Sequence, residues 1–393
     1  MSARSRRPRL VHVTTTDISL AWLLGPQLRA FAAAGYEVIG VSAPGPYADE
    51  LRASGIEHRP LRHATRSMSP ARDVGAFAEL YRVFRELRPD IVHTHNPKPG
   101  VYGRIAARAA RVPVVVNTVH GLYALPEDRF AKRAVVYSLE RVASTCSDAE
   151  LLQNVEDLST LRRLGIPARK MRVLGNGIDL ARFDPARIDP SRVEVLRKEM
   201  GAEPGDVLCG LVGRLVWEKG YREVFAAAAR LCERVPNLRF AIIGPTDPDK
   251  SDAVRATDIA AAEQLGNMRF LGSREDVDDL YAAMDLIVLA SYREGFPRTP
   301  MEAAAMGVPV VATDIRGCRQ VVDDCGNGLL VPLRDVDALC AAIEHLATRS
   351  DVRARMGAAG REKALQEFDQ ERVIAITLET YERALANRGG DHR

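Results

Sequence analysis

The chain lacks the features that mark membrane-spanning, disulfide-stabilised and nucleic-acid-binding proteins. It has no run of about 18 apolar residues, so the sequence predicts no transmembrane helix. The basic segment MSARSRRPRL has no apolar core of the kind that a signal peptide carries. The six cysteines form no CxxC pair and have no histidines at zinc spacing, which predicts reduced thiols in a cytoplasmic protein. Basic residues are not interleaved with aromatics, so no nucleic-acid partner is expected.

The charge is unevenly distributed along the chain. Residues 1–185 carry 27 Lys and Arg against 18 Asp and Glu, a net charge of +9. The remaining residues carry 28 against 34, a net charge of −6. A basic first half suits an anionic lipid surface or an anionic substrate. Because arginine outnumbers lysine throughout, a compositional bias is the alternative explanation, and the sequence leaves both open.

Short β-branched runs alternate with amphipathic helical patterns over the whole chain. At 393 residues, two domains are expected rather than one. The runs of the first half are residues 9–15, 37–43, 90–95, 112–121 and 171–177. Those of the second half are residues 207–215, 238–244, 268–273, 286–291, 308–314 and 328–333. The alternation predicts two doubly wound α/β domains with parallel sheets, joined by residues 176–190. Ligands of such sheets bind at the carboxyl ends of the strands, so the cleft between the domains is the expected site.

Two glutamates stand eight positions apart in SYREGFPRTPMEAAAMG, residues 291–307. The segment TPME matches a capping box, with Thr299 as the N-cap and Glu302 at the third helical position. The helix is then expected to end at Gly307. This capping role is one explanation for Glu302, and it leaves Glu294 unexplained.

Glu294 falls on the loop after a predicted strand and before that helix. The start of a helix at the carboxyl end of a strand favours anions, because unpaired amides and the helix dipole point there. A carboxylate at that point would repel a phosphate, but it suits the hydroxyls of a sugar. The stretch therefore indicates a site for a nucleotide sugar.

Two further strand ends carry residues suited to chemistry. In GRLVWEKG (213–220), Arg214 and Lys219 suit a diphosphate, and an ordinary solvated loop is the alternative. In NTVHG (117–121), His120 is followed by glycine at a predicted strand end, where a functional and a structural role are both open.

These motifs together resemble the retaining glycosyltransferases of family 4. Glu294 and Glu302 form an E-x7-E pair, which occurs here with the Arg–Lys loop, VHG and NGID in the family's order. The resemblance covers nearly the whole chain and implies the GT-B fold, two doubly wound Rossmann-like domains facing a central cleft. The segments TTTDISL, HTHNPKPGVYGRIAARAA and EGFPR further resemble the branch that acts on capsule and lipid-linked oligosaccharides. Residues 1–178 would bind the acceptor, residues 190–365 the nucleotide sugar, and a helix over residues 366–387 would pack back on the first domain.

The resemblance also implies a role for each residue. Arg214 and Lys219 would stabilise the leaving diphosphate. Glu294 would orient the hydroxyls of the donor sugar, and His120 would contact that sugar near the reacting carbon. The ribose and the base would be held by Glu302 and Arg274. Other expected donor contacts are Gly295, Phe296, Arg298 and Thr299.

The acceptor side is less well defined, because the loop TTTDIS lacks the glycine pair that many family members carry. Asp17, Ser19 and His95 are the expected acceptor contacts. For Asp17 we favour the alternative that it caps a helix starting near Ser19.

The implied mechanism needs no protein nucleophile, no cofactor and no metal ion. The departing phosphate takes the proton of the acceptor in a front-face attack, unlike the two-carboxylate scheme of glycosidases. Asp247 and Asp249 mimic a metal-binding D-x-D motif, but Asp-Pro turns are common loop chemistry.

The predicted activity is transfer of a hexose or N-acetylhexosamine from a nucleotide sugar, with UDP as the nucleotide, to a lipid-linked saccharide in the assembly of surface polysaccharide. The basic segment 129–141 would favour an anionic membrane surface, placing the protein in the cytoplasm or at the inner face of the membrane. A soluble acceptor and a nucleotide-sugar epimerase of GT-B shape are the alternatives.

Overall fold

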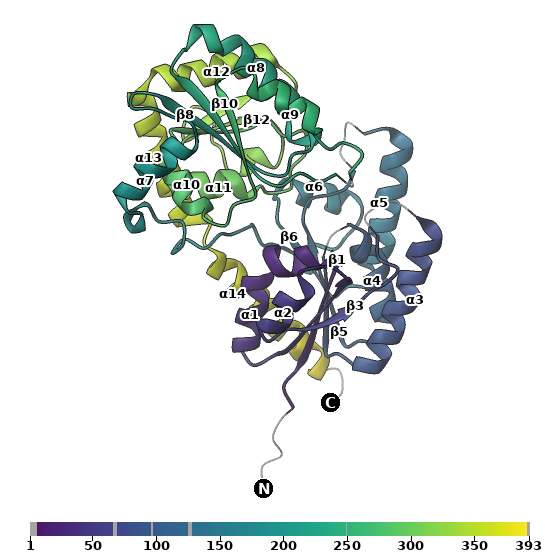
Figure 1. The fold of residues 1–393 in the computed structure, drawn as a ribbon. Coiled ribbons are helices and arrows are strands. Elements are labelled where there is room, and N and C mark those ends of the chain that lie inside the picture. Colours follow the sequence, from purple (N-terminus) through teal and green to yellow (C-terminus); the bar gives the residue numbers. More distant parts are fainter. Residues whose placement is uncertain (1–5, 66–68, 96, 125–127, 249, 391–393) are drawn as a thin grey trace. The chain divides into compact units, whose positions relative to one another are not determined.

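The structure is a computed structural model that describes residues 6–65, 69–95, 97–124, 128–248 and 250–390. The chain divides into two compact units (Figure 1). The first unit comprises Met1–Gly175 together with Glu371–Arg393, and the second comprises Asn176–Gln370. Residues 176–190, expected as a connection, group with the second unit.

The first unit is built on a seven-stranded parallel sheet with the order β3-β2-β1-β4-β5-β6-β7. Its strands are β1 (Arg9–Thr16), β2 (Glu37–Ala43), β3 (Glu57–Pro60), β4 (Ile91–His95), β5 (Val114–Val119), β6 (Ala149–Leu152) and β7 (Met171–Val173). Its helices are η1 (Ser19–Leu23), α1 (Gly25–Ala33), α2 (Ala48–Ala53), α3 (Pro70–Leu87), α4 (Pro97–Ala109), α5 (Phe130–Ser144), α6 (Glu156–Arg163), η2 (Ala168–Lys170) and α14 (Gln370–Gly390).

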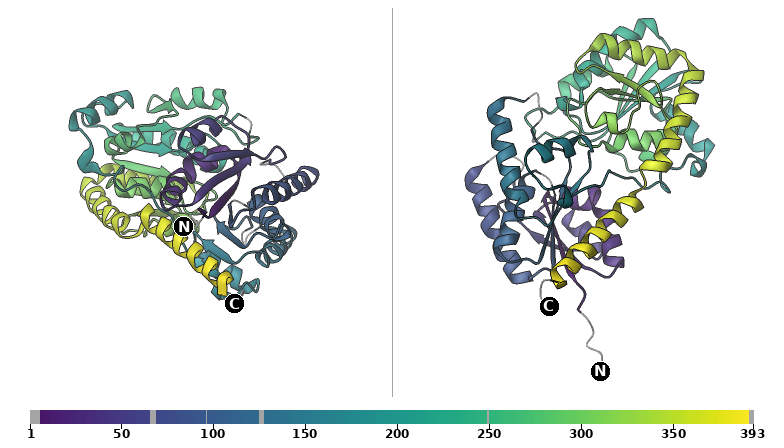
Figure 2. Two further views of the ribbon diagram at one scale, coloured as in Figure 1. Left: turned by 90° about the horizontal axis from the view of Figure 1, so that it is seen from below. Right: turned by 180° about the vertical axis from the view of Figure 1, so that it is seen from behind.

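Successive residues of β1 point to opposite faces of this sheet, so each face has its own core. Val11 and Val13 pack against α3 and α4, whereas Leu10 packs with side chains of α1, α2 and α14. The helix α14 thus returns to the first unit from the far end of the described chain (Figure 2). Because β1 alternates in this way, His12 lies on the α1 and α14 side.

The second unit repeats the scheme with a six-stranded parallel sheet of order β10-β9-β8-β11-β12-β13. Its strands are β8 (Val207–Val212), β9 (Leu238–Ile243), β10 (Met268–Gly272), β11 (Leu286–Leu289), β12 (Val310–Thr313) and β13 (Gly328–Val331). Its helices are η3 (Pro185–Arg187), α7 (Pro190–Glu199), η4 (Trp217–Lys219), α8 (Tyr221–Arg234), α9 (Ala256–Glu263), α10 (Val277–Ala283), α11 (Arg298–Ala305), η5 (Cys318–Gln320), α12 (Val336–Thr348) and α13 (Ser350–Glu367). One apolar core lies under α8 and α12, and the other under α7, α10 and α11.

The expected fold class is confirmed, and two strands of the first sheet were missed. The edge strand β3 reads EHRP and is too short and polar to give an apolar run. The strand β6 reads AELL and carries a fully buried glutamate, Glu150. That carboxylate is tolerated because the buried guanidinium of Arg104 lies 2.7 Å from Glu150 and 2.9 Å from Glu140.

No helix in the described part of the chain has both the length and the apolar composition needed to cross a bilayer.

Candidate active site

The strand order of the second unit singles out the loops after β8 and β11. Strands β9 and β10 extend the sheet on one side of β8, while β11, β12 and β13 extend it on the other. In an open parallel sheet, such a reversal brings two diverging loops together at the carboxyl ends of the strands, where ligands bind. Here the two loops are joined by a hydrogen bond of 2.9 Å from the Tyr292 amide to the Glu218 carbonyl.

Lys219 and Glu294 meet across these two loops. The Lys219 ammonium, at the end of η4, lies 2.6 Å from Glu294 Oε1. Their side chains are 26% and 13% exposed, so the pair is partly shielded from water and stronger than an ion pair on the open surface. The sequence predicted that both residues belong to one site, and the structure brings them together. The pair offers a cation to a leaving anion and a carboxylate to sugar hydroxyls.

A glycine explains how the two loops come so close. Gly220 has a φ of +81°, a left-handed conformation that side chains disfavour. A Cβ atom there would lie 2.1 Å from the carbonyl oxygen of Ala290, directly after β11. Only glycine lets the chain pass this point, and Lys219 immediately precedes it.

Arg214 is engaged by a carboxylate on the same edge of the sheet. Its Nη1 atom lies 2.7 Å from Asp247 Oδ2, and the arginine side chain remains 42% exposed. Asp247 is the first residue of the D-x-D-like segment, and its carboxylate neutralises the Arg214 guanidinium. Asp249 lies outside the described residues. A diphosphate contacting Arg214 would have to share the guanidinium with Asp247.

The predicted capping box at the start of α11 is wrong. The helix begins at Arg298 and its N-cap is Pro297, which makes no side-chain cap, so Thr299 lies inside the first turn. The Thr299 hydroxyl donates to the Val212 carbonyl at 3.1 Å and fastens α11 to the end of β8. The expected stop is confirmed, because the helix ends at Ala305 and Gly307 follows with a φ of +74°.

Glu302 is therefore not used as a cap. Its Oε2 atom accepts a hydrogen bond of 3.0 Å from the Tyr281 hydroxyl, and its Oε1 atom lies 3.5 Å from Nε of Arg298. Burial, together with the nearby Glu302 carboxylate, raises the pKa of Tyr281 well above its usual value. The tyrosine consequently stays a donor and holds one oxygen of Glu302 in place.

The other expected donor contacts are held in different ways. Arg274 makes two hydrogen bonds to Asp276, of 2.8 and 2.7 Å, and a further one to Glu199. The hydrogen bond from Arg274 lowers the pKa of Asp276 to about 2. The ring of Phe296 packs edge-on against Phe368 with centroids 6.1 Å apart. Its carbonyl accepts from Asn176 Nδ2 at 2.9 Å, so this residue anchors the loop that carries Glu294 and its neighbour Gly295.

In the first unit, the expectation that Asp17 caps a helix is wrong. The short helix η1 has Ile18 as its N-cap and no side-chain cap. The Asp17 carboxylate instead accepts from the amide of Ile18 at 2.9 Å and from the amide of Tyr47 at 2.8 Å, tying the end of β1 to the start of α2. Ser19 lies beside it, with its hydroxyl 3.1 Å from that of Thr16.

His120 and His95 are neighbours at the carboxyl ends of β5 and β4. His95 Nδ1 lies 3.0 Å from His120 Nε2, and His95 Nε2 lies 2.9 Å from His12 Nδ1. With 1% of its surface exposed and both ring nitrogens on other histidines, His95 stands behind His120 rather than in an acceptor site. Burial lowers the pKa of His120 to about 4, opposed by a hydrogen bond with Gln153, so its imidazole is neutral at physiological pH.

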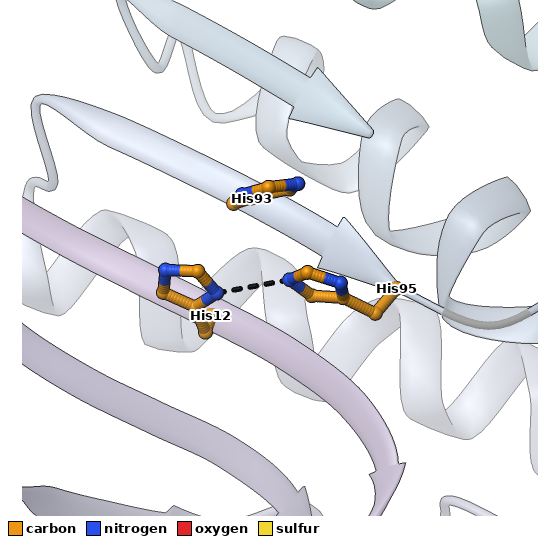
Figure 3. A group of neighbouring side chains, drawn as sticks. All are labelled: His12, His93 and His95. Atoms are coloured by element: carbon orange, nitrogen blue, oxygen red, sulfur yellow. Dashed lines mark hydrogen bonds between the residues drawn. The ribbon is translucent and has the colours of Figure 1, made fainter. Parts of the chain in front are cut away.

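Among the described residues, His12, His93 and His95 are the group with ligand atoms close enough to share a metal ion, within 4.8 Å of one another (Figure 3). The ring nitrogens are already used: His12 bonds to His95, and His93 lies 2.5 Å from the Tyr381 hydroxyl and 2.7 Å from that of Thr118. The group contains no carboxylate to offset a divalent charge. Hydrogen bonding among neutral rings accounts for the cluster.

Comparison with known proteins identifies the family. Residues 27–182 match the family described as Glycosyltransferase Family 4, and residues 193–363 match Glycosyl transferases group 1. The chain is 32% identical over 285 residues to the UDP-Gal:alpha-D-GlcNAc-diphosphoundecaprenol alpha-1,3-galactosyltransferase of Escherichia coli, covering 71% of each chain. The chain belongs to glycosyltransferase family 4.

This family 4 glycosyltransferase resembles a second relative over almost its full length. It is 26% identical over 369 residues to the N,N'-diacetylbacillosaminyl-diphospho-undecaprenol alpha-1,3-N-acetylgalactosaminyltransferase of Campylobacter jejuni, covering 92% of this chain and 95% of the relative. A crystal structure of Anabaena HepE in complex with UDP superposes with a TM-score of 0.79 at 21% identity, covering 96% and 100% of the two chains. The resemblance read from the motifs is thereby confirmed, as is the GT-B fold.

The sequence did not predict the contacts that hold the charged groups in place. Tyr281 donates to Glu302 across 21 residues, and Gly220 allows the close approach to Ala290. Asp247 was named only for its D-x-D-like spacing, and its bond to Arg214 spans 33 residues. One signal was available: a glycine directly after the lysine of an expected phosphate loop. The histidine behind His120 was visible as HTH in β4, but its link to His12 depends on which strands are neighbours.

Proposed function

We propose that this glycosyltransferase moves a hexose or N-acetylhexosamine from a UDP-sugar to a lipid-linked saccharide, with retention of the anomeric configuration and without a metal ion. The Lys219–Glu294 pair at the switch point of the second sheet carries the donor part of the proposal. The acceptor class follows the E. coli and C. jejuni relatives, whose names specify undecaprenol-linked sugars.

The donor would bind along the loops after β8 and β11 and the start of α11. The Lys219 ammonium faces the diphosphate, with Arg214 as a second cation, and the first amides of α11 add the positive end of its dipole. Glu294 accepts hydrogen bonds from sugar hydroxyls, and Glu302 accepts them from the ribose. Arg274 would lie beside the base, held by Asp276.

The charges of this site favour departure of the diphosphate. Negative charge grows on the phosphate oxygen as the glycosidic bond breaks, and preorganised cations stabilise that change without reorganising. The acceptor hydroxyl attacks from the same face and gives its proton to the departing phosphate, so the configuration is retained. Glu294 orients the sugar and forms no covalent intermediate. His120, neutral at physiological pH, contacts the transferred sugar without adding a positive charge beside the developing cation.

A screen of nucleotide sugars by thermal unfolding tests the donor assignment. A UDP-sugar at about one hundred times its dissociation constant should stabilise the protein by about 2.7 kcal/mol, while GDP- and ADP-sugars should not. Transfer is then measured on an undecaprenyl-diphosphate sugar and on water-soluble sugars, with and without EDTA. Activity on soluble acceptors alone would refute the lipid-linked assignment, and loss with EDTA would refute metal independence. NMR of the product shows whether the configuration is retained, and donor isomerised without acceptor would indicate an epimerase.

The helix α5 supplies a surface for the membrane that carries such an acceptor. Val135, Leu139 and Val142 stand at helical spacing and are 58%, 43% and 58% exposed, and Phe130 at the start of the helix is 77% exposed. Arginines at positions 129, 133 and 141 accompany this apolar face. An apolar face with basic flanks suits the surface of an anionic bilayer.

Sedimentation with vesicles tests the membrane contact. Binding to vesicles containing phosphatidylglycerol is expected at low ionic strength. The bound fraction should fall at about 0.5 M salt, because salt screens the attraction between the basic side chains and the anionic lipid. The double variant Val135→Ser, Leu139→Ser should bind less, whereas Val195→Ser, an equally exposed valine on α7 of the second unit, should bind as the wild type does. An absence of binding at low salt would refute this contact.

A further inference from the structure

A chain of hydrogen bonds runs through the core of the first unit to His120. It starts at the Thr118 hydroxyl, 2.7 Å from His93 Nε2, and passes from His93 Nδ1 to the Tyr381 hydroxyl at 2.5 Å. Tyr381 then lies 3.4 Å from His12 Nε2. The last two links connect ring nitrogens: His12 to His95 at 2.9 Å (Figure 3), and His95 to His120 at 3.0 Å.

The chain is isolated from solvent until its last member. His12, His93, His95 and Tyr381 are at most 1% exposed, whereas His120 is partly exposed at the end of β5. Four segments distant in sequence supply the members. The histidines lie on β1, on β4 and directly after β5, and the tyrosine lies on α14. Burying so many polar groups is tolerated only when each is hydrogen-bonded, and here each ring nitrogen of the three buried histidines has a partner.

The chemistry of neutral imidazole links the protons along this chain. A neutral ring has one nitrogen that donates and one that accepts. If His95 donates to His120 from Nδ1, its Nε2 must accept from His12 Nδ1, and the reverse sense reverses both bonds. The direction of these hydrogen bonds therefore decides which nitrogen of His120 carries the proton. The proton is on Nδ1 when His95 donates to His120, and on Nε2 when His95 accepts.

We propose that His12 and His95 are positioning residues, which with Tyr381 fix the ring orientation and the tautomer of His120. The inference rests on the proposed function, in which His120 contacts the transferred sugar. It assigns to α14 a part in the first unit's site, because the Tyr381 hydroxyl holds the inner end of the chain. It also gives a reason for the buried histidines other than a metal ion.

A pair of substitutions at one position separates positioning from bulk packing. In His95→Asn the side-chain amide takes the place of Nδ1 and retains the contact with His120. In His95→Gln the amide takes the place of Nε2, so the contact with His12 survives and the one with His120 is lost. Misplacing a group at a reacting centre costs about 100-fold in rate. We expect kcat to fall about 10- to 100-fold in His95→Gln and His95→Phe, and by a smaller factor in His95→Asn, which keeps the contact with His120 but loses the link to His12, with an unchanged KM for the donor.

A matched control and a spectroscopic measurement accompany the kinetics. His58→Gln removes another buried histidine of the first unit, bonded to the Ser42 hydroxyl at 2.9 Å, and should leave kcat unchanged. Nitrogen-15 NMR of labelled histidines should show a single neutral tautomer for His120 in the wild type and averaged ring signals in His95→Gln. Equal kcat losses in the Asn and Gln variants, or an unchanged His120 spectrum in His95→Gln, would overturn the inference.

A double-mutant cycle distinguishes failure of this inference from failure of the proposed function. His95→Gln should cause no further loss of kcat in a His120→Asn background, because it acts through that ring. Wild-type activity in His120→Asn alone would overturn the role of His120 in the proposed function. Loss of activity in His120→Asn with full activity in His95→Gln would overturn only the positioning role. One equivalent of bound transition metal, absent from His95→Phe, would overturn it in favour of a metal centre.

Discussion

Acid should destabilise the first unit steeply, at a pH where most proteins remain folded. His12, His93 and His95 are fully buried, and burial lowers the pKa of all three, that of His12 from 6.5 to about 3. In the unfolded chain their pKa values return to about 6.5. Below that pH the unfolded state binds more protons than the folded one, so the stability that these groups supply at neutral pH is lost as the pH falls.

The size of the effect follows from the number of groups. Each buried histidine contributes a slope of about 1.4 kcal/mol per pH unit between its unfolded and folded pKa values. For His12, whose folded pKa is about 3, that slope lowers the free energy of unfolding by about 2 kcal/mol between neutral pH and pH 5. His93 and His95, whose pKa values are also lowered, add to this loss, and the whole stability of a typical domain is about 5–15 kcal/mol.

Tryptophan fluorescence during urea unfolding provides the assay, because the chain has two tryptophans, one in each unit. In Trp217→Phe, Trp22 reports the first unit, and in Trp22→Phe, Trp217 reports the second, which contains none of the buried cluster. Replacing His12 by Gln should reduce the pH slope of the first unit by about 1.4 kcal/mol per pH unit. Two results would refute the reasoning. In the intact cluster, the free energy of unfolding of the first unit could change with pH no more steeply than one histidine predicts, or the second unit could show the same pH slope.

Three further predictions concern single charged groups. Lys219→Met should lower kcat/KM about 100- to 1,000-fold, as removal of a preorganised charge at a leaving group does, and should lower the melting temperature because Glu294 loses its partner; a loss of kcat/KM under tenfold in a steady-state assay would contradict the prediction. Glu302→Gln keeps an acceptor for Tyr281, so thermal stability should be preserved while UDP affinity in calorimetry falls about tenfold, and an unchanged affinity would remove Glu302 from the nucleotide site. Arg104→Met leaves the buried Glu150 carboxylate without its cation, so the free energy of unfolding in urea should fall by about 3–5 kcal/mol. Adding Glu150→Gln should partly restore it, and an unchanged stability of the single variant would contradict the role of this ion pair.

The sequence predicted the fold well, because parallel sheets leave a strong local signal. Strands buried on both faces read as continuous β-branched runs, and all six runs of the second half became strands. The two missed strands fail this rule for a physical reason. The strand β3 lies at an edge, and β6 buries a glutamate whose partner, Arg104, is 46 residues away.

The sequence indicates residue types for the candidate site, whereas the contacts between them depend on the tertiary structure. Lys219 and Glu294 were chosen from separate motifs, and the strand order brings them within 2.6 Å. The capping role of Thr299 failed because helix α11 begins two residues earlier than the TPME motif suggests. This two-residue shift turns the expected cap into a side chain that donates a hydrogen bond to the Val212 carbonyl of β8, and no local pattern predicts it.

The return of α14 to the first unit has a consequence for biosynthesis. On the ribosome, the strands of the first unit emerge early, but Val373, Ile374 and Tyr381, which complete one of its cores, follow only after the whole second unit. Domains usually fold in the order of synthesis. Here the second unit should reach its final fold first. Until α14 is synthesised, the face of the first sheet that it covers stays exposed, and chaperones can bind it. Premature termination before residue 370 would then yield a finished second unit attached to an unfinished first one.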